Sequence, residues 1–466
     1  MMDYVSTRGS APNLGFSEAL LAGLARDGGL YVPRQWPTFS PADIRSMRGL
    51  PYPELAIRLL TPFVEGEIDP ATFAKIVREA YGTFRHEAVC PIVQAGPNSF
   101  ILELFHGPTL AFKDVAMQLL ARLMDHVLTQ QGRRATIAGA TSGDTGGAAI
   151  EAFAGRDRTD IFILFPHGRV SPVQQRQMTT SRAANVHTLA IQGDFDDCQA
   201  LVKEMFNDHA FRDRVALAGV NSINWARIMA QIVYYFSSAL SLGSPDRPVS
   251  FTVPTGNFGD IFAGYAAKRM GLPIERLVIA TNDNDILART LATGSYETRG
   301  VVETTSPSMD IQVSSNFERL LFEASGRDAA TVLRYMAGLK QSGAFTLDTN
   351  VLDAIRSEFS AGRASVEEVA ATIRETLSAT GLVIDPHTAA GVFVARANAT
   401  ADTPMVILST AHPAKFPAAV EAACGLHPAL PAWLGDLMSR EEKFSVLPSE
   451  LKMVEDHINR HARTVR

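Results

Sequence analysis

From about residue 98 onward, short apolar runs that fit β-strands are each followed by a segment with helical spacing. The runs are 100–105, 136–140, 161–165, 249–253, 277–281 and 405–408. Such alternation is typical of parallel sheets flanked by helices, so it predicts an α/β fold. Open sheets of this kind bind ligands beyond the carboxyl ends of their strands, where helix N-termini gather. The strand-to-helix turns are therefore the places where a functional site is expected.

The two ends of the chain differ from this alternating region. Residues 1–90 combine short helical patterns with frequent prolines, which predicts a separate, mostly helical N-terminal domain. Residues 91–426 form the predicted α/β core, and 427–466 look like a polar C-terminal extension. A chain of 466 residues exceeds the usual size of one domain, so more than one is expected.

Charge and composition exclude several classes of function. The formal net charge is -6, and no run of Lys or Arg supplies the basic stripe that nucleic-acid binding needs. The first residues lack the pattern of a secretory signal, and no apolar run is long enough to span a bilayer. We therefore expect a cytoplasmic protein with a small-molecule substrate and no nucleic-acid or membrane partner. Cys90, Cys198 and Cys424 are too few and too far apart to indicate disulfides or a metal site.

The turn at 104–114 carries a lysine at a predicted helix start. An apolar strand ends at Phe105, and residues 116–128 keep helical spacing, so Lys113 lies where the helix begins. The partial positive charge of a helix N-terminus disfavours a second cation and lowers the pKa of such an amine, although Asp114 opposes this effect. A neutral lysine is the nucleophile that forms an imine with an aldehyde. His106, in the same turn, fits a packed histidine better than a catalytic one.

Two further turns are rich in glycine. After the strand 249–253, the sequence 254–260 places Gly256 and Gly259 at the start of a helix, where backbone N–H groups can cradle a phosphate. This turn lacks the ending of a Walker loop and the three glycines of a dinucleotide fingerprint, so it fits a small phosphorylated ligand. The turn 139–149 crowds four glycines with Thr and Ser residues, which suits a grip on a carboxylate or phosphate or, alternatively, a capped tight turn.

Seven segments together resemble motifs of the threonine synthase family, in the longer form with an additional N-terminal domain. They occur in the expected order and cover nearly the whole chain: 4–9, 104–114, 141–147, 220–227, 254–260, 306–319 and 409–416. The resemblance implies a fold-type II pyridoxal-phosphate enzyme, in which two α/β subdomains enclose the cofactor and the N-terminal domain packs against them. It also implies a lyase reaction, the last step of threonine biosynthesis: O-phospho-L-homoserine and water give L-threonine and phosphate.

The resemblance also implies roles for individual residues. Lys113 corresponds to the lysine that holds pyridoxal 5'-phosphate as a Schiff base, and Thr410 to the hydroxyl that faces the pyridine nitrogen. The phosphate of the cofactor is assigned to Gly256, Asn257, Phe258 and Gly259. Asp144 stands where shorter relatives have Asn beside the ring hydroxyl of the cofactor. The substrate is assigned to Ser142, Gly143, Thr145, Asn221, Ser222, Asn224 and Arg227, whose forked guanidinium suits a phosphate dianion. Arg319 is a second candidate for the substrate, with a structural role as its alternative.

Other functions remain open at this point. A phospho-lyase of the same fold would release 2-oxobutyrate from the same substrate, and a non-catalytic relative would bind the cofactor or a phosphorylated metabolite as a sensor. A dinucleotide-binding oxidoreductase is disfavoured by the missing fingerprint. The sequence leaves both a monomer and a homodimer possible.

Overall fold

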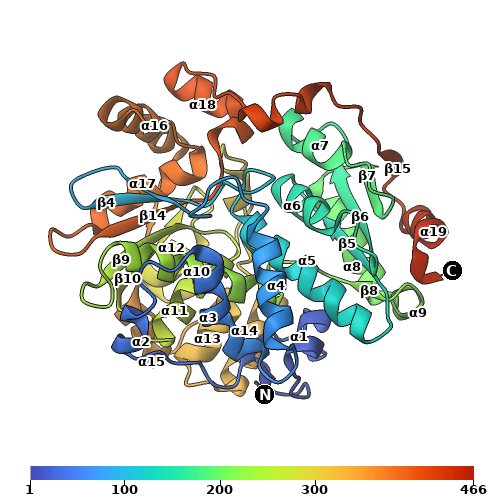
Figure 1. The fold of residues 1–466 in the computed structure, drawn as a ribbon, viewed down its shortest axis with the longest axis horizontal. Coiled ribbons are helices and arrows are strands. Elements are labelled where there is room, and N and C mark those ends of the chain that lie inside the picture. The colour runs from blue at the N-terminus through green and yellow to red at the C-terminus, as the bar shows by residue number, and fades with distance from the viewer. Residues whose placement is uncertain (1, 466) are drawn as a thin grey trace.

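The computed structural model describes residues 2–465, and its two larger sheets lie side by side (Figure 1). The first has six strands in the order β13-β10-β9-β14-β4-β3. All neighbours are parallel except β3, which pairs antiparallel with β4. The bounds are β3 (Ile92–Gln94), β4 (Ser99–Glu103), β9 (Val249–Pro254), β10 (Ile274–Thr281), β13 (Phe359–Arg363) and β14 (Met405–Ser409).

The second sheet has five strands in the order β15-β7-β6-β5-β8, and every neighbouring pair is parallel. The bounds are β5 (Ala135–Ala140), β6 (Thr159–Pro166), β7 (Val186–Gln192), β8 (Leu217–Ala218) and β15 (Ser445–Pro448). The six strands expected from the apolar runs are therefore confirmed, and the α/β fold with them. Parallel strands need helical crossovers, which is why each apolar run is followed by helical spacing.

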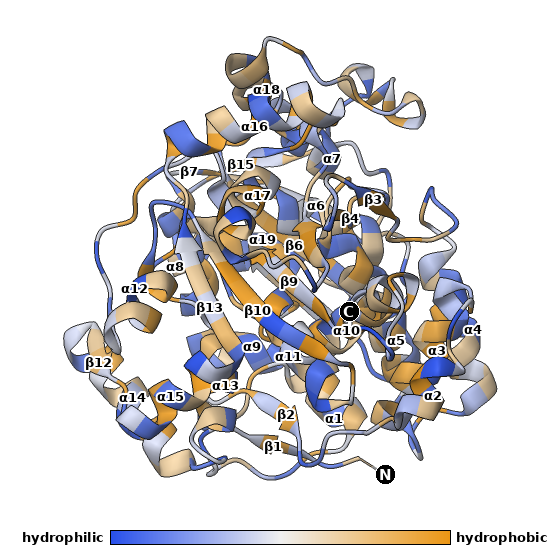
Figure 2. Ribbon diagram, turned by 90° about the vertical axis from the view of Figure 1, so that its left-hand side faces the viewer, coloured by the Kyte–Doolittle hydropathy of each residue, from blue (hydrophilic) through white to orange (hydrophobic). Residues whose placement is uncertain are grey.

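Both sheets are covered on both faces. In β10, Leu277 and Ile279 belong to the main core, whereas Val278 and Ala280 join a separate cluster with Val394 of helix α17 (Pro386–Asn398). Successive side chains of a strand point to opposite faces, so this split assigns helices to each side. Figure 2 shows the consequence, because strands β6, β9 and β10 at the centre are coloured as hydrophobic.

The helices of the core connect the strands and separate the two sheets. Helix α10 packs against both α5 and α11. Their bounds are α5 (Lys113–Gln130), α6 (Asp144–Phe153), α7 (Pro172–Thr179), α8 (Phe195–Asn207), α9 (His209–Arg214), α10 (Trp225–Ser241), α11 (Gly259–Arg269), α12 (Ile286–Thr293), α13 (Phe317–Ala324), α14 (Ala329–Ser342), α15 (Thr349–Glu358), α16 (Val366–Thr380) and α18 (Pro417–Cys424). A small antiparallel pair, β11 (Ser295–Glu297) and β12 (Ala344–Thr346), lies outside the two sheets.

The N-terminal region is mostly helical, as expected, with a short antiparallel pair that the sequence did not predict. It contains β1 (Tyr4–Ser6), α1 (Phe16–Ala22), β2 (Tyr31–Pro33), α2 (Pro41–Arg45), α3 (Tyr52–Val64) and α4 (Pro70–Tyr81). Helix α3 packs on α10, and α4 packs on α5. Helix α4 starts where the side chain of Asp69 accepts a hydrogen bond from the Thr72 backbone, with Pro70 in the first turn.

The C-terminal residues are built into the second sheet. Strand β15 pairs with β7, and helix α19 (Leu451–His461) packs on α8. Val454 and Ile458 of α19 join a buried cluster with Phe162 and Leu164 of β6. Within residues 2–465, no helix combines the length and the apolar composition that crossing a membrane requires.

Candidate active site

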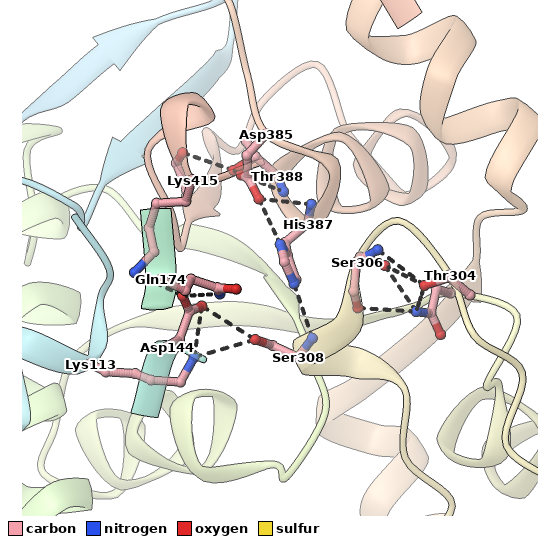
Figure 3. Close-up of polar contacts among 12 residues, drawn as sticks. Lys113, Asp144, Gln174, Thr304, Ser306, Ser308, Asp385, His387, Thr388 and Lys415 are labelled. Carbon is pink, nitrogen blue, oxygen red and sulfur yellow. Dashed lines mark hydrogen bonds and ion pairs between the residues drawn. The ribbon is translucent and has the colours of Figure 1, made fainter. Parts of the chain in front are cut away.

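Three neighbouring parallel strands deliver the predicted residues to one edge of the first sheet. Lys113 follows β4, Thr410 follows β14, and Gly256 follows β9, so the carboxyl ends of these strands place all three turns together. The second sheet contributes Asp144, the first residue of α6, which follows β5. Figure 3 shows Lys113 and Lys415 directed at the carboxylate of Asp144.

The lysine turn is held by its own side chains. Leu110 adopts a left-handed backbone with φ of 62°. The carboxylate of Asp114 accepts hydrogen bonds from the backbone and the hydroxyl of Thr109, both at 2.7 Å. Lys113 is the first residue of α5, which confirms the expected helix start. The carboxylate that opposes loss of the Lys113 charge is Asp144, however, and not the adjacent Asp114.

The Lys113 amine is buried in a polar pocket. Its Nζ lies 3.3 Å from Asp144 Oδ2 and 3.4 Å from Ser308 Oγ. Burial lowers the pKa of Lys113, the charges of Lys415 and Arg227 lower it further, and Asp144 opposes them. The net direction favours the neutral, nucleophilic amine.

Asp144 is surrounded by donors. Its Oδ1 accepts from Lys415 Nζ at 2.8 Å and from Gln174 Nε2 at 2.9 Å, while Oδ2 faces Lys113 and Ser308. Burial alone would raise the pKa of Asp144, but Lys415 and Lys113 hold it well below its usual range. The carboxylate is therefore ionised at neutral pH.

The glycine turn after β9 presents free backbone donors. Phe258 adopts the left-handed region with φ of 63°, and a Cβ at Gly256 would lie 2.5 Å from the carbonyl oxygen of Ser308. Ser314 Oγ and Asn316 Nδ2 donate to the carbonyl oxygens of Gly256 and Asn257 at 2.6 and 2.9 Å. The backbone N–H groups of 256–259 donate no hydrogen bond to any protein acceptor among residues 2–465. The turn is thus fixed by its carbonyls and offers its N–H groups to an anion.

Arg227 is a buried cation with donors left over. The residue is 4% exposed, and the one hydrogen bond that its guanidinium makes to residues 2–465 runs from Nη1 to Val220 O at 3.3 Å. Its Nε has no hydrogen-bond partner within the described part of the chain. Burial lowers the pKa of Arg227 to about 10. An unpaired buried guanidinium is costly, so this group points to an anionic ligand.

The other residues predicted to bind the substrate or cofactor differ in exposure and in whether their side chains already bond to the protein. Ser142 and Asn221 are exposed, Thr145 and Ser222 are half-buried, and Gly143 has φ of 146° in contact with Gln174. Asn224 caps α10 by accepting from Ala226 N, and its amide donates to Leu20 O at 2.9 Å. The hydroxyl of Thr410 bonds no protein group among residues 2–465, although its carbonyl accepts from Phe112 N.

Comparison with known proteins decides the family. A model described as "Threonine synthase N terminus" matches residues 3–81, "Pyridoxal-phosphate dependent enzyme" matches 90–337, and "Threonine synthase, C-terminal" matches 388–458. The chain is 54% identical to a threonine synthase from Pseudomonas aeruginosa over 462 residues, which cover 99% of this chain and 98% of that protein. The chain belongs to the threonine synthase family.

Solved structures agree with this membership. A pyridoxal-phosphate-bound threonine synthase from Brucella melitensis is 71% identical with a TM-score of 0.98, covering 99% of this chain and 100% of that one. The yeast threonine synthase is 40% identical with a TM-score of 0.94, and 98% of each chain is covered. The predictions of a fold-type II enzyme and of pyridoxal phosphate as its cofactor are confirmed.

The structure also brings in residues to which the sequence analysis gave no role. Ser308 and Lys415 lie in the segments 306–319 and 409–416, which resemble threonine synthase motifs. Their place in these motifs is the signal by which the sequence could have identified them. Gln174 and His387 carry no local signal, because their helices reach the site only through the tertiary fold. His387 Nε2 accepts from Ser308 N at 3.2 Å, which leaves Nδ1 to donate to Asp385 Oδ2 at 2.7 Å.

Arg319, the second candidate for a threonine synthase substrate, is fully buried and committed to the protein. Its Nη2 donates to Tyr31 O at 2.9 Å and to Ile223 O at 2.6 Å, and its Nη1 donates to Asn316. Burial lowers the pKa of Arg319 to about 9. Its contacts join the N-terminal region to the loop before α10, which supports the structural alternative.

Proposed function

We propose that this chain converts O-phospho-L-homoserine and water into L-threonine and phosphate, with Lys113 as the residue that binds the cofactor. The observation that carries the proposal is the buried Lys113 amine, which shares Ser308 with the glycine turn: Ser308 Oγ lies 3.4 Å from Lys113, and Ser308 O packs on Gly256. A reactive amine and a set of free anion donors therefore border the same residue.

The residues present fit pyridoxal phosphate. The free N–H groups of Gly256, Asn257, Phe258 and Gly259 would hold its phosphate, and Asp144 would lie beside its ring hydroxyl. The Thr410 hydroxyl would face the ring nitrogen. When bound, the cofactor supplies a conjugated ring that spreads negative charge away from the substrate carbons.

The protein side chains then perform the remaining tasks. Lys113, once displaced by the amine of the substrate, would move protons at the α- and β-carbons, because its lowered pKa favours the neutral amine that can act as a base. Arg227 has unused donors for the phosphate of the substrate and helps that leaving group to carry its charge. The neutral hydroxyl of Thr410 holds no proton on the ring nitrogen, which moderates charge withdrawal and disfavours side reactions.

The finer substrate contacts belong to the same proposal. Ser142, Gly143, Thr145, Asn221 and Ser222 would bind substrate oxygens, and Asn224 would act mainly by capping α10 and fixing the loop that carries Asn221 and Ser222. We also propose the domain boundaries 1–90, 91–426 and 427–466, with the last region completing the second sheet.

The test combines spectra with product analysis. Purified protein with added pyridoxal phosphate should absorb in the visible range, and borohydride should fix the cofactor to the peptide that contains Lys113. Incubation with O-phospho-L-homoserine should release phosphate and threonine in equal amounts. Lys113→Ala should abolish both the fixation and the turnover, and threonine formation by that variant would contradict the proposal. Release of 2-oxobutyrate in place of threonine would favour the phospho-lyase.

A further inference from the structure

A second lysine is buried at the site with no assigned role. Lys415 closes the short helix η2 (Pro413–Lys415) after β14, and its side chain is fully buried. Its Nζ lies 2.8 Å from Asp144 Oδ1 and donates to Thr109 O at 2.8 Å. Figure 3 shows this amine and that of Lys113 on the same carboxylate. Lys415 therefore ties α6 to the lysine turn.

The two lysines do not share Asp144 equally. Lys415 Nζ is 2.8 Å from Oδ1, where Gln174 also donates, whereas Lys113 Nζ is 3.3 Å from Oδ2. Lys415 is enclosed and bonded to a carbonyl of the turn, so it has no route out of the contact. Lys113 must leave the contact, because its amine has to react. The shorter contact thus belongs to the lysine that stays.

We propose that Lys415 is the permanent counter-ion of Asp144, and this inference rests on the proposed role of Lys113. As a positioning residue, Lys415 keeps the carboxylate of Asp144 paired while Lys113 loses its proton. One ammonium and one carboxylate then remain when Lys113 is neutral. Without Lys415, the buried charge of Asp144 would have Lys113 as its only ammonium partner. That carboxylate would hold the proton on Lys113, because an isolated buried charge is costly.

Other charged groups face Lys113, and they do not change with Lys415. Arg227 on α10 disfavours the charged amine, and Asp260 on α11 lies close enough to interact with it. The Lys113 amine also contacts the Ser308 hydroxyl and the Phe112 ring, at 4.9 Å from the ring centroid, and both groups are uncharged. Burial lowers the pKa of Lys113, and Lys415 adds to this, in line with the geometry.

The consequence concerns loading of the cofactor. The neutral amine of Lys113 adds to the aldehyde carbon, a C=N bond replaces the C=O bond, and the oxygen leaves as water. Only the unprotonated amine can begin this step. Each unit by which the pKa of Lys113 rises lowers the neutral fraction at neutral pH about tenfold. The rate of loading as a function of pH therefore reports on Lys415.

The experiment measures this loading rate on apoprotein. Pyridoxal phosphate is added at a fixed concentration across pH 6–11, and borohydride traps the covalent product, which is mapped to the Lys113 peptide. Lys415→Met should shift the pH–rate midpoint upward by about one unit or more, and slow loading at pH 7.5 about tenfold or more. Lys75→Met is the matched control, since its side chain is 76% exposed on α4, and it should keep the wild-type profile.

A charge-balanced variant separates electrostatics from packing. Lys415→Met combined with Asp144→Asn removes both charges of the pair, so the midpoint should return toward the wild-type value although both side chains are altered. A merely structural role would leave the double variant at least as impaired as the single one. Should Lys415→Met fail to fold, the comparison passes to Lys415→Gln with the same Asp144→Asn partner.

The outcomes distinguish this inference from the proposed function. A single variant with the wild-type midpoint, or a double variant without recovery, overturns the role of Lys415 while fixation at Lys113 stands. A wild-type midpoint at or above the value of about 10.4 for an ordinary lysine also overturns it. Fixation of the cofactor at another residue would instead overturn the proposed function itself.

Discussion

Two buried arginines near the site have opposite relations to their surroundings. Arg319 directs its donors at Tyr31 O, Ile223 O and Asn316, whereas the guanidinium of Arg227 makes a single hydrogen bond among residues 2–465, to Val220 O at 3.3 Å. Burial lowers the pKa of both, to about 9 and about 10 respectively. An arginine whose donors are all bonded to the protein is indicated as structural, whereas one with unbonded donors is indicated as a binding site for an anion. The two arginines therefore differ in function because they differ in hydrogen-bond partners.

Substitution of Arg227 should therefore affect turnover more than folding. Arg227→Met removes the donors that we propose for the substrate phosphate, and kcat/KM for O-phospho-L-homoserine should fall about 10²–10³-fold, as when one preorganised donor is lost. The visible absorbance of bound cofactor should stay unchanged. Steady-state assays of phosphate release check the rate, and loss of absorbance in this variant would reassign Arg227 to the cofactor.

Arg319→Met should show the converse pattern. It leaves the buried carbonyl oxygen of Tyr31 and the partly buried one of Ile223 without the donors of Arg319, which costs about 1–3 kcal/mol for a fully buried unsatisfied group. Urea unfolding of the apoprotein should give a lower free energy of unfolding by that order. A variant that unfolds like the wild type but fails to turn over substrate would restore Arg319 as a substrate ligand.

Substitution of Thr410 tests whether its hydroxyl faces the ring nitrogen of the cofactor. Its hydroxyl has no protein partner among residues 2–465, and its backbone carbonyl is fixed by Phe112 N at 2.8 Å. If Thr410 faces the ring nitrogen as proposed, Thr410→Asp would place a carboxylate there that holds a proton on the nitrogen and strengthens charge withdrawal. The ratio of threonine to 2-oxobutyrate should fall, as measured by chromatography of the products. Thr410→Ser is the control and should keep the ratio.

At the scale of elements, the sequence predicts what is encoded locally. The apolar runs gave β4, β5, β6, β9, β10 and β14, and the onset of helical spacing placed Lys113 at the first residue of α5. The glycine turn likewise follows from its own residues. Lys415, Gln174 and His387 were not assigned roles, because their function depends on which helix faces which strand, and a single sequence does not encode that locally. The attribution of charge balance to Asp114 was wrong for the same reason.

The titratable residue Asp260 links helices α10 and α11 by hydrogen bonds. Asp260, in the first turn of α11, accepts from the hydroxyl of Tyr234, and its carbonyl accepts from Tyr235 Oη at 2.9 Å. Its Oδ2 has no hydrogen-bond partner among residues 2–465. Burial raises the pKa of Asp260 to about 6, despite the two tyrosine hydroxyls that lower it. This junction positions the helix that follows the glycine turn.

Asp260→Asn should change how stability depends on pH. A carboxyl whose pKa is raised on folding stabilises the folded state below its unfolded pKa, and this contribution is lost as the pH rises through the folded value. A rise from 3.8 to about 6 corresponds to about 3 kcal/mol. Relative to the wild type, the Asn variant should gain most of that amount, about 2 kcal/mol, between pH 4 and pH 6.5 in urea unfolding of apoprotein. A difference that does not vary with pH would contradict this prediction.

At the scale of the molecule, both ends of the chain are fastened to the core. The N-terminal region is joined to α13 by Arg8 and Thr7, which bond Glu318 at 2.9 and 2.6 Å. The C-terminal region closes the second sheet, and Arg463 donates from Nε and from its backbone to Asp160 at 2.7 Å each. The C-terminal end thus completes the second sheet, whereas the N-terminal end is held by helices α5, α10 and α13, and loss of either would expose a buried cluster.

The C-terminal attachment should weaken in acid. His457 of α19 stacks on His461 with ring centroids 4.3 Å apart, and His461 lies 5.3 Å from His187 of β7. Burial, together with the charge of the neighbouring histidines, lowers the pKa of His187 and of His457 to about 4. Above about pH 6.5 these histidines are neutral in both the folded and the unfolded state. Below that pH they bind protons in the unfolded chain but not in the folded chain, because their pKa is lowered on folding. Stability is therefore lost as the pH falls from 6.5 to 4.

His457→Phe removes one of these proton sites and keeps an aromatic ring against His461. Its free energy of unfolding should fall less between pH 7 and pH 5 than that of the wild type, as measured by urea unfolding at each pH. His427→Gln provides the control, because that side chain is 65% exposed and its replacement should leave the wild-type loss intact. Limited proteolysis at pH 5 should cut the wild type first around α19, since protonation acts where the histidines meet β6 and β7. Equal loss of stability in the wild type and in His457→Phe would show that this cluster does not control the acid sensitivity of the molecule.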